Sequence, residues 1–197
     1  MRIRSAVSLE YLSSAWMAVE VVGSVAVGLL AGSFALLAFG GDSIVELISA
    51  SVVLRHLRRD ASGSDHLGAG TGRATNLLLF SLIPIIGGGA AFSYLSGLKP
   101  EGSPLGIAVA IGAVVIMPYL WLRKRMMGKE TRCLPLSMDA TASATCFFMA
   151  SALLGGLLAE FFLGLWWVDY LAAAVILSFV AREAVGGRRA LEADAES

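Results

Sequence analysis

Six long, continuously apolar segments constrain this chain more than any other feature of its sequence. A helix that crosses a bilayer needs about 20 mainly apolar residues. We identify six such segments, at residues 10–31, 33–55, 75–97, 104–122, 134–158 and 164–182. Because these runs are continuous rather than alternating, they favour helices over the strands of a membrane barrel. We therefore expect an all-α, polytopic membrane protein, with a bundle of six transmembrane helices formed by residues 1–185.

The composition argues against several other classes of protein. Of the 197 residues, 57% are hydrophobic and 15% are charged, whereas soluble domains carry about 25% charged residues. Fifteen basic and fifteen acidic residues cancel, so the net charge gives no sign of a nucleic-acid partner. The two cysteines, Cys133 and Cys146, cannot form a disulfide framework. Since no nucleophile triad, P-loop or nucleotide fingerprint is present, we expect neither an enzyme nor a prosthetic group.

The basic residues predict how the spans are oriented, because cytoplasmic loops are enriched in Lys and Arg. Lys99 is the only one of the fifteen basic residues that falls on the opposite side from the other fourteen. Both termini, including a charged tail at residues 186–197, are therefore expected in the cytoplasm. Glu10 and Glu20 interrupt the first segment, which favours a retained span over a cleaved signal peptide. The compact chain fits a place in the plasma membrane of a prokaryotic cell.

Acidic side chains inside the spans have no basic partner there. Glu20 lies in the middle of the first span, and Asp42 and Glu46 lie in the second. Asp139 follows near the start of the fifth span and Asp169 near the outer end of the sixth, while no Lys, Arg or His lies inside a span away from its ends. A carboxylate near the bilayer centre is costly unless it is paired, protonated or hydrated. We therefore expect these carboxyl groups to hold protons, line a water-filled cavity or bind a cation.

Three polar groups are predicted at a similar depth. Glu20, Glu46 and Cys146 each lie about ten to twelve residues from the cytoplasmic end of their span, so at 1.5 Å per residue their depths agree within a few Å. Asp42 lies one turn from Glu46 on the same helix face. Carboxylates and a thiolate suit Zn²⁺, whereas Mg²⁺ and Ca²⁺ prefer more oxygen ligands. We predict a divalent-metal site of Asp42, Glu46 and Cys146, with Glu20 as a fourth ligand or proton carrier.

Each candidate also has a structural interpretation. Cys146 can serve as a small apolar side chain, and Glu20 as a protonated, hydrogen-bonded group. Asp169 follows two tryptophans and is expected to cap the outer start of the sixth span. Asp139 is a further candidate metal ligand, and it could equally cap the fifth span or line a cytoplasmic vestibule. The loop between the second and third spans is either an accessory metal site or a solvated, Gly-rich loop; its candidate ligands are His56, Asp60, Asp65 and His66.

Residues 33–46 of the second span read SFALLAFGGDSIVE. This stretch resembles the second helix of the cation diffusion facilitator family, whose pattern is S-x-A-L-L-A-D-A-x-[HD]-S-x-x-x-D. The resemblance places Asp42 and Glu46 at the first two metal-ligand positions. Residues 166–173, WWVDYLAA, resemble the start of the sixth helix with its Asp-Pro-x-Ala signature, and Asp139-Ala140 resembles the start of the fifth-helix motif D-x-x-H-x-x-x-D. The resemblance implies a zinc-type divalent cation transporter that exchanges metal for protons and forms a homodimer in the bilayer.

The sequence also departs from that family. Ala142 occupies the His position of the fifth-helix motif, Cys146 occupies its Asp position, and Phe39 replaces an Asp of the second helix. The family's cytoplasmic metal-binding domain has no counterpart after the sixth span. We therefore expect a short form of the family, similar to the vertebrate transmembrane zinc-binding proteins related to it. Glu20 as a replacement ligand is inferred from its depth and is not a family feature.

Three functions are compatible with these features. The first is a secondary transporter of a divalent cation, with Zn²⁺ as the leading substrate and protons as the exchanged ion. The second is a zinc-binding membrane protein that does not transport, and that buffers metal or modulates a partner. The third is a proton-coupled carrier of another solute, in which Glu20, Asp42 and Glu46 serve purely as proton sites.

Overall fold

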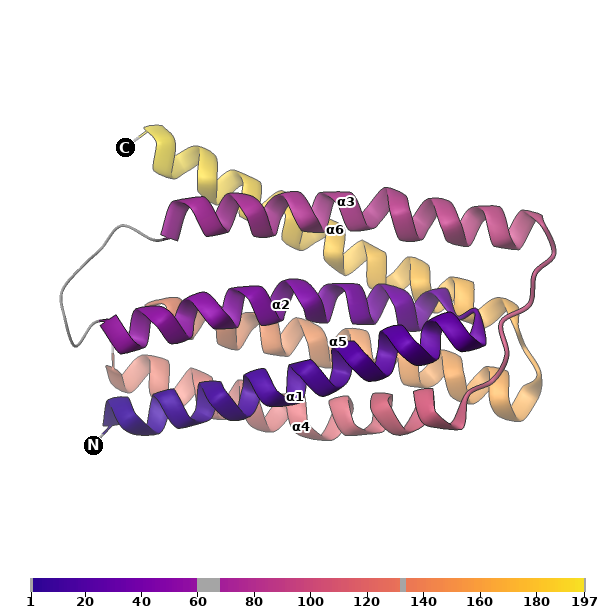
Figure 1. Ribbon diagram of the computed structural model, residues 1–197, viewed down its shortest axis with the longest axis horizontal. Coiled ribbons are helices and arrows are strands. Elements are labelled where there is room, and N and C mark those ends of the chain that lie inside the picture. Colours follow the sequence, from indigo (N-terminus) through magenta and orange to yellow (C-terminus); the bar gives the residue numbers. More distant parts are fainter. Residues whose placement is uncertain (1, 60–67, 132–133, 197) are drawn as a thin grey trace.

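The computed structural model describes residues 2–59, 68–131 and 134–196, with side chains described at 7–51, 54–55, 76–127 and 140–188. Within these ranges the chain forms six α-helices and no strand (Figure 1), which confirms the predicted all-α bundle. The helices are α1 (Arg2–Ala31), α2 (Phe34–Arg59), α3 (Gly68–Leu95), α4 (Pro104–Thr131), α5 (Leu134–Leu163) and α6 (Trp167–Glu196). Asp60, Asp65, His66 and Cys133 lie outside the described residues, and the side chains of His56 and Asp139 are outside the described side chains.

Five of the helices are long and apolar enough to cross a membrane, which indicates a membrane protein. The candidate spans are Val7–Ala31, Phe34–Ser51, Asn76–Leu95, Pro104–Met127 and Ala140–Leu163. The sixth predicted span corresponds to the apolar part of α6, and its crossing of the membrane stays a prediction. Residues 186–196, expected as a tail, continue α6 as helix, because Ala, Leu, Glu and Arg all favour helix.

Helix α2 occupies the centre of the bundle. It contacts α1, α3, α5 and α6, while α4 packs on α1 and α5, and α3 packs on α2 and α6. Figure 1 shows both termini at one end of the bundle and the α3–α4 and α5–α6 connections at the other. We call this second end, which also holds the α1–α2 turn, the outer end; its position outside the cytoplasm stays a prediction.

Small residues on α2 let its neighbours approach closely beside Asp42. A Cβ atom added to Gly40 would lie 2.9 Å from Val25 Cγ2 of α1, and one added to Gly41 would lie 2.5 Å from Leu82 Cδ1 of α3. A side chain at Gly40 would also meet the Val25 backbone nitrogen at 3.2 Å, and a side chain at Gly41 would displace the Leu82 side chain. The two glycines thus allow α1 and α3 to close around the segment of α2 that carries the first acidic candidate.

Candidate functional site

Asp42 lies in the interior of the bundle, where its side chain is fully buried on α2. Neither of its carboxylate oxygens has a hydrogen-bond partner among the described residues. The charged side chains that lie close enough to affect it are Glu183 of α6 and Glu20 of α1, and both are acidic. Because an apolar interior disfavours several unpaired negative charges together, this position requires protons or a cation.

Glu20 approaches the same region from α1 and is also fully buried. Its Oε1 atom accepts a hydrogen bond of 2.5 Å from Trp16 Nε1, one turn earlier on the helix. Its Oε2 atom has no partner in the described part of the chain. The hydroxyl of Ser43 lies nearby and donates to the Phe39 carbonyl oxygen at 3.0 Å. One oxygen of Glu20 is therefore held in place while the other can bind a ligand.

Cys146 completes the predicted set from α5. The thiol is fully buried and lies close to Glu46, Glu20 and Asp42. The structure thus brings together all four residues that the sequence analysis combined into one site. Their role as metal ligands stays a prediction.

Glu183 is a fifth member that the sequence analysis missed, because it falls just beyond the predicted end of the sixth span. Figure 1 shows α6 crossing the bundle at an angle, and this path brings Glu183 near Asp42 of α2 and near Thr145 of α5. The spacing of the two acids could have indicated this position. Glu183 follows Asp169 by fourteen residues, which is close to four helical turns. Both acids therefore lie near the same face of α6. We call Glu20, Asp42, Glu46, Cys146 and Glu183 the core cluster.

The core cluster is not arranged as a finished metal site. Among the residues whose side chains are described, no three His, Cys, Asp or Glu groups are placed so that they could hold one metal ion. The donors are neighbours, but they do not converge on a common point. Asp139 lies beyond the described side chains of α5, so its membership in the cluster is untested. The donor types still suit a cation, because carboxylates and a thiol are Zn²⁺ ligands.

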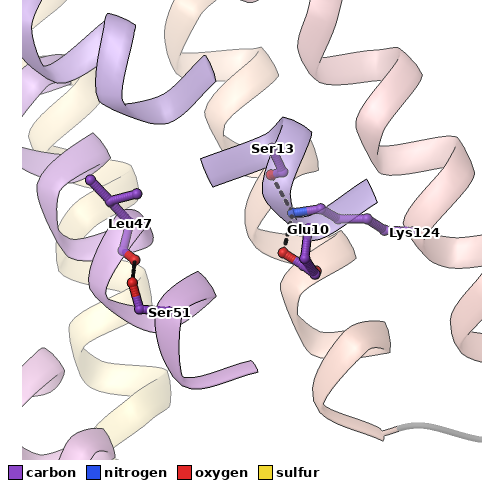
Figure 2. Close-up of polar contacts among 5 residues, drawn as sticks. All are labelled: Glu10, Ser13, Leu47, Ser51 and Lys124. Atoms are coloured by element: carbon purple, nitrogen blue, oxygen red, sulfur yellow. Dashed lines mark hydrogen bonds and ion pairs between the residues drawn. The ribbon is translucent and has the colours of Figure 1, made fainter. Parts of the chain in front are cut away.

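A buried base contradicts one expectation from the sequence. Lys124 lies within the candidate span Pro104–Met127 and is fully buried. Its Nζ atom is 3.6 Å from Glu10 Oε2 and donates a 2.6 Å hydrogen bond to Ser13 Oγ (Figure 2). The prediction that the interior of the spans contains no base is wrong here, because α4 continues past residue 122 and lays Lys124 against α1. Glu10 lies ten residues from Glu20, about 15 Å along α1, so this pair is separate from the core cluster.

Asp169 caps a helix, but not the helix that the sequence analysis expected. Its carboxylate accepts hydrogen bonds from Ser33 Oγ at 2.5 Å, from the Phe34 amide at 2.9 Å and from the Ala35 amide at 3.3 Å. Ser33 Oγ in turn accepts a bond from the Leu36 amide at 3.1 Å. These amides belong to the first turn of α2, whose free N–H groups need acceptors. Asp169 therefore caps α2 across the interface, and the expected cap on α6 is wrong.

Comparisons of the sequence with known protein families and with curated proteins find no match. The likeness to the cation diffusion facilitator family therefore rests on the motifs in the second, fifth and sixth spans and stays a prediction. The structure itself describes a helical membrane protein whose interior gathers four carboxyl groups and a thiol from four helices.

Proposed function

We propose that this protein is a secondary transporter of a divalent metal cation, with Zn²⁺ as the leading substrate. The observation that carries the proposal is the core cluster, in which acidic groups from α1, α2 and α6 meet beside a thiol on α5. The one buried base among the described side chains, Lys124, contacts Glu10 instead. Several carboxylates in an apolar interior need positive charge to remain ionised, and a cation substrate supplies it.

The donor types support both the choice of metal and the use of protons. A thiolate among carboxylates favours Zn²⁺ over Mg²⁺ or Ca²⁺. The same groups must lose their protons before they bind metal. Metal and protons therefore compete for one set of side chains, which is the chemical requirement for antiport.

The arrangement of the donors also suits transport rather than permanent storage. The cluster takes side chains from α1, α2, α5 and α6, so a shift of one helix against the others changes the site. The donors lie close without a finished coordination geometry, so the ion would draw them together by side-chain rotation. Alternating exposure of a midplane site by rocking helices is a common device in transporters. Six crossings, as the apolar segments predict, a plasma-membrane location and the homodimer implied by the family resemblance complete the proposal.

The test is Zn²⁺ uptake by vesicles that contain the purified protein, with and without a proton gradient. The informative variant is Asp42→Asn, which keeps the volume of the side chain and removes its charge. A matched control is Glu101→Gln, the same change at an exposed position in the α3–α4 connection. We expect gradient-driven uptake in the wild type and in the control, and its loss in Asp42→Asn.

Two results would contradict the proposal that the protein transports Zn²⁺. Stoichiometric Zn²⁺ binding that Asp42→Asn abolishes, without uptake by the wild type, would show a zinc-binding protein that does not transport. Neither binding nor uptake of Zn²⁺, together with proton-dependent flux of another solute, would show that the core cluster carries protons only. Wild-type uptake in both Asp42→Ala and Glu46→Ala would remove the core cluster from the pathway.

A further inference from the structure

A second pair of acidic side chains lies at the outer end, away from the core cluster. Glu160 is in the last turn of α5 with 7% of its surface exposed, and Asp169 is in the first turn of α6 with 1% exposed. The two carboxyl groups lie within electrostatic range of each other. Asp169 binds the start of α2 at Phe34, and Asp42 follows eight residues later, about 12 Å along the helix.

The packing of α5 on α6 directs Glu160 toward Asp169. Gly156 lies one turn before Glu160, and a Cβ atom added there would lie 2.9 Å from Ala172 Cβ and 3.6 Å from the Val168 carbonyl oxygen. Residues four apart share a helix face, so Glu160 faces the first turn of α6. The Gly164 amide donates to the Glu160 carbonyl oxygen at 2.9 Å and so closes the last turn of α5.

The two carboxyl groups differ in their hydrogen-bond partners. Asp169 accepts three hydrogen bonds from the start of α2. Both carboxyl oxygens of Glu160 are buried without a hydrogen-bond partner among the described residues. Two buried carboxyl groups side by side, one of them without hydrogen-bond donors, are costly to ionise together. A cation between the two groups would remove this cost.

The described basic and hydroxyl groups near the pair, Lys99 and Tyr170, have partners of their own. Lys99, the one base whose side chain is described at this end, lies over the Trp166 ring with its Nζ atom 5.6 Å from the ring centroid. The Tyr170 hydroxyl donates to the Leu98 carbonyl oxygen at 2.8 Å.

We propose that Glu160 and Asp169 bind a divalent cation at the outer end, where α5, α6 and the start of α2 meet. The available donors are oxygens: two carboxylates and the Ser33 hydroxyl that already contacts Asp169. Oxygen ligands favour Mn²⁺, Mg²⁺ or Ca²⁺, whereas the thiol of the core cluster favours Zn²⁺. Water would fill the remaining coordination positions. This site is independent of the transport proposal, since it shares no residue with the core cluster.

Mn²⁺ is a suitable probe, because free Mn²⁺ can be counted by electron paramagnetic resonance during a titration of the full chain in detergent. The variants are Glu160→Gln, which keeps the shape of the side chain, and Asp42→Asn in the core cluster. Glu101→Gln serves as the exposed control. We expect Glu160→Gln to weaken Mn²⁺ binding at least tenfold, while the Glu101→Gln control binds as the wild type does; Asp42→Asn reports whether the ion lies in the core cluster instead.

The outcomes separate the two sites. Wild-type Mn²⁺ affinity in Glu160→Gln, or no Mn²⁺ binding by the wild type, would overturn the outer site. Loss of Mn²⁺ in Asp42→Asn alone would place the ion in the core cluster and would also overturn it. If Glu160→Gln aggregates, Glu160→Asp keeps the charge on a shorter side chain, and unchanged affinity in that variant would count against the proposal. A parallel Zn²⁺ titration of Asp42→Asn reports on the core cluster, so failure of either site is recognised separately.

Discussion

The buried pair of Glu10 and Lys124 should couple α1 to α4 strongly, and a double-mutant cycle can measure this coupling. Both side chains are fully buried, and Lys124 Nζ lies 3.6 Å from Glu10 Oε2. At that separation and an effective dielectric constant of about 20, two unit charges attract by roughly 5 kcal/mol. Removal of one partner from a buried pair typically costs about 3–5 kcal/mol. We therefore expect Glu10→Leu to destabilise the protein by about that amount.

The other two corners of the cycle should behave differently. Lys124→Met should lower the free energy of unfolding less than Glu10→Leu does, since the Glu10 carboxyl that remains can take up a proton and become neutral. The double variant Glu10→Leu with Lys124→Met should lie within about 1 kcal/mol of the wild type, because apolar replacements of a buried pair are often neutral. The two changes are then strongly non-additive, with a coupling energy of about 3 kcal/mol in the sense defined by such cycles.

The free energies can be obtained from reversible unfolding by dodecyl sulfate in mixed micelles, followed by tryptophan fluorescence. Arg123→Met is the matched control, because Arg123 is adjacent to Lys124 in sequence but exposed. It should leave the free energy of unfolding within about 0.5 kcal/mol of the wild type. If the double variant is destabilised by the sum of the single variants, the two charges do not interact and our account of the pair is wrong.

Two further predictions concern α6. Asp169→Ala should lower the free energy of unfolding by about 2–4 kcal/mol, because it removes the acceptor for three hydrogen bonds at the start of α2; the same unfolding assay measures this, and an unchanged stability would show that the cap contributes nothing. Glu183→Gln should weaken Zn²⁺ binding at least tenfold in isothermal titration calorimetry, since it removes a negative charge beside Asp42; wild-type affinity would exclude Glu183 from the ion site.

The all-α bundle was predictable because the length of an apolar run decides whether a helix can cross a bilayer. The proximity of Glu20, Glu46 and Cys146 was predictable for a related reason, since every residue advances a helix by 1.5 Å and depth can be counted from a span's end. Such counting compares depths but says nothing about which faces meet. The structure shows which faces meet, because α1 approaches α2 at Gly40 and α3 approaches α2 at Gly41.

The residues that sequence reasoning missed lie where hydropathy falls but the helix continues. Lys124, Glu160 and Glu183 were each placed just outside a predicted span, yet α4, α5 and α6 extend past those limits. Burial at such positions depends on the neighbouring helix and not on local composition. The capping role of Asp169 was hidden for the same reason, because its partners belong to another helix. A local motif cannot show a contact between segments so distant in sequence.

The hydrogen bond between Ser33 and Asp169 also determines when the start of α2 can be capped during synthesis. The two residues are 136 positions apart, so at usual rates of translation Asp169 is made roughly 7 to 27 s after Ser33. During that interval the first amides of α2 must be hydrated by water at the membrane surface. The second helix acquires its final cap only when the sixth helix arrives, so a segment made later completes one that was made earlier.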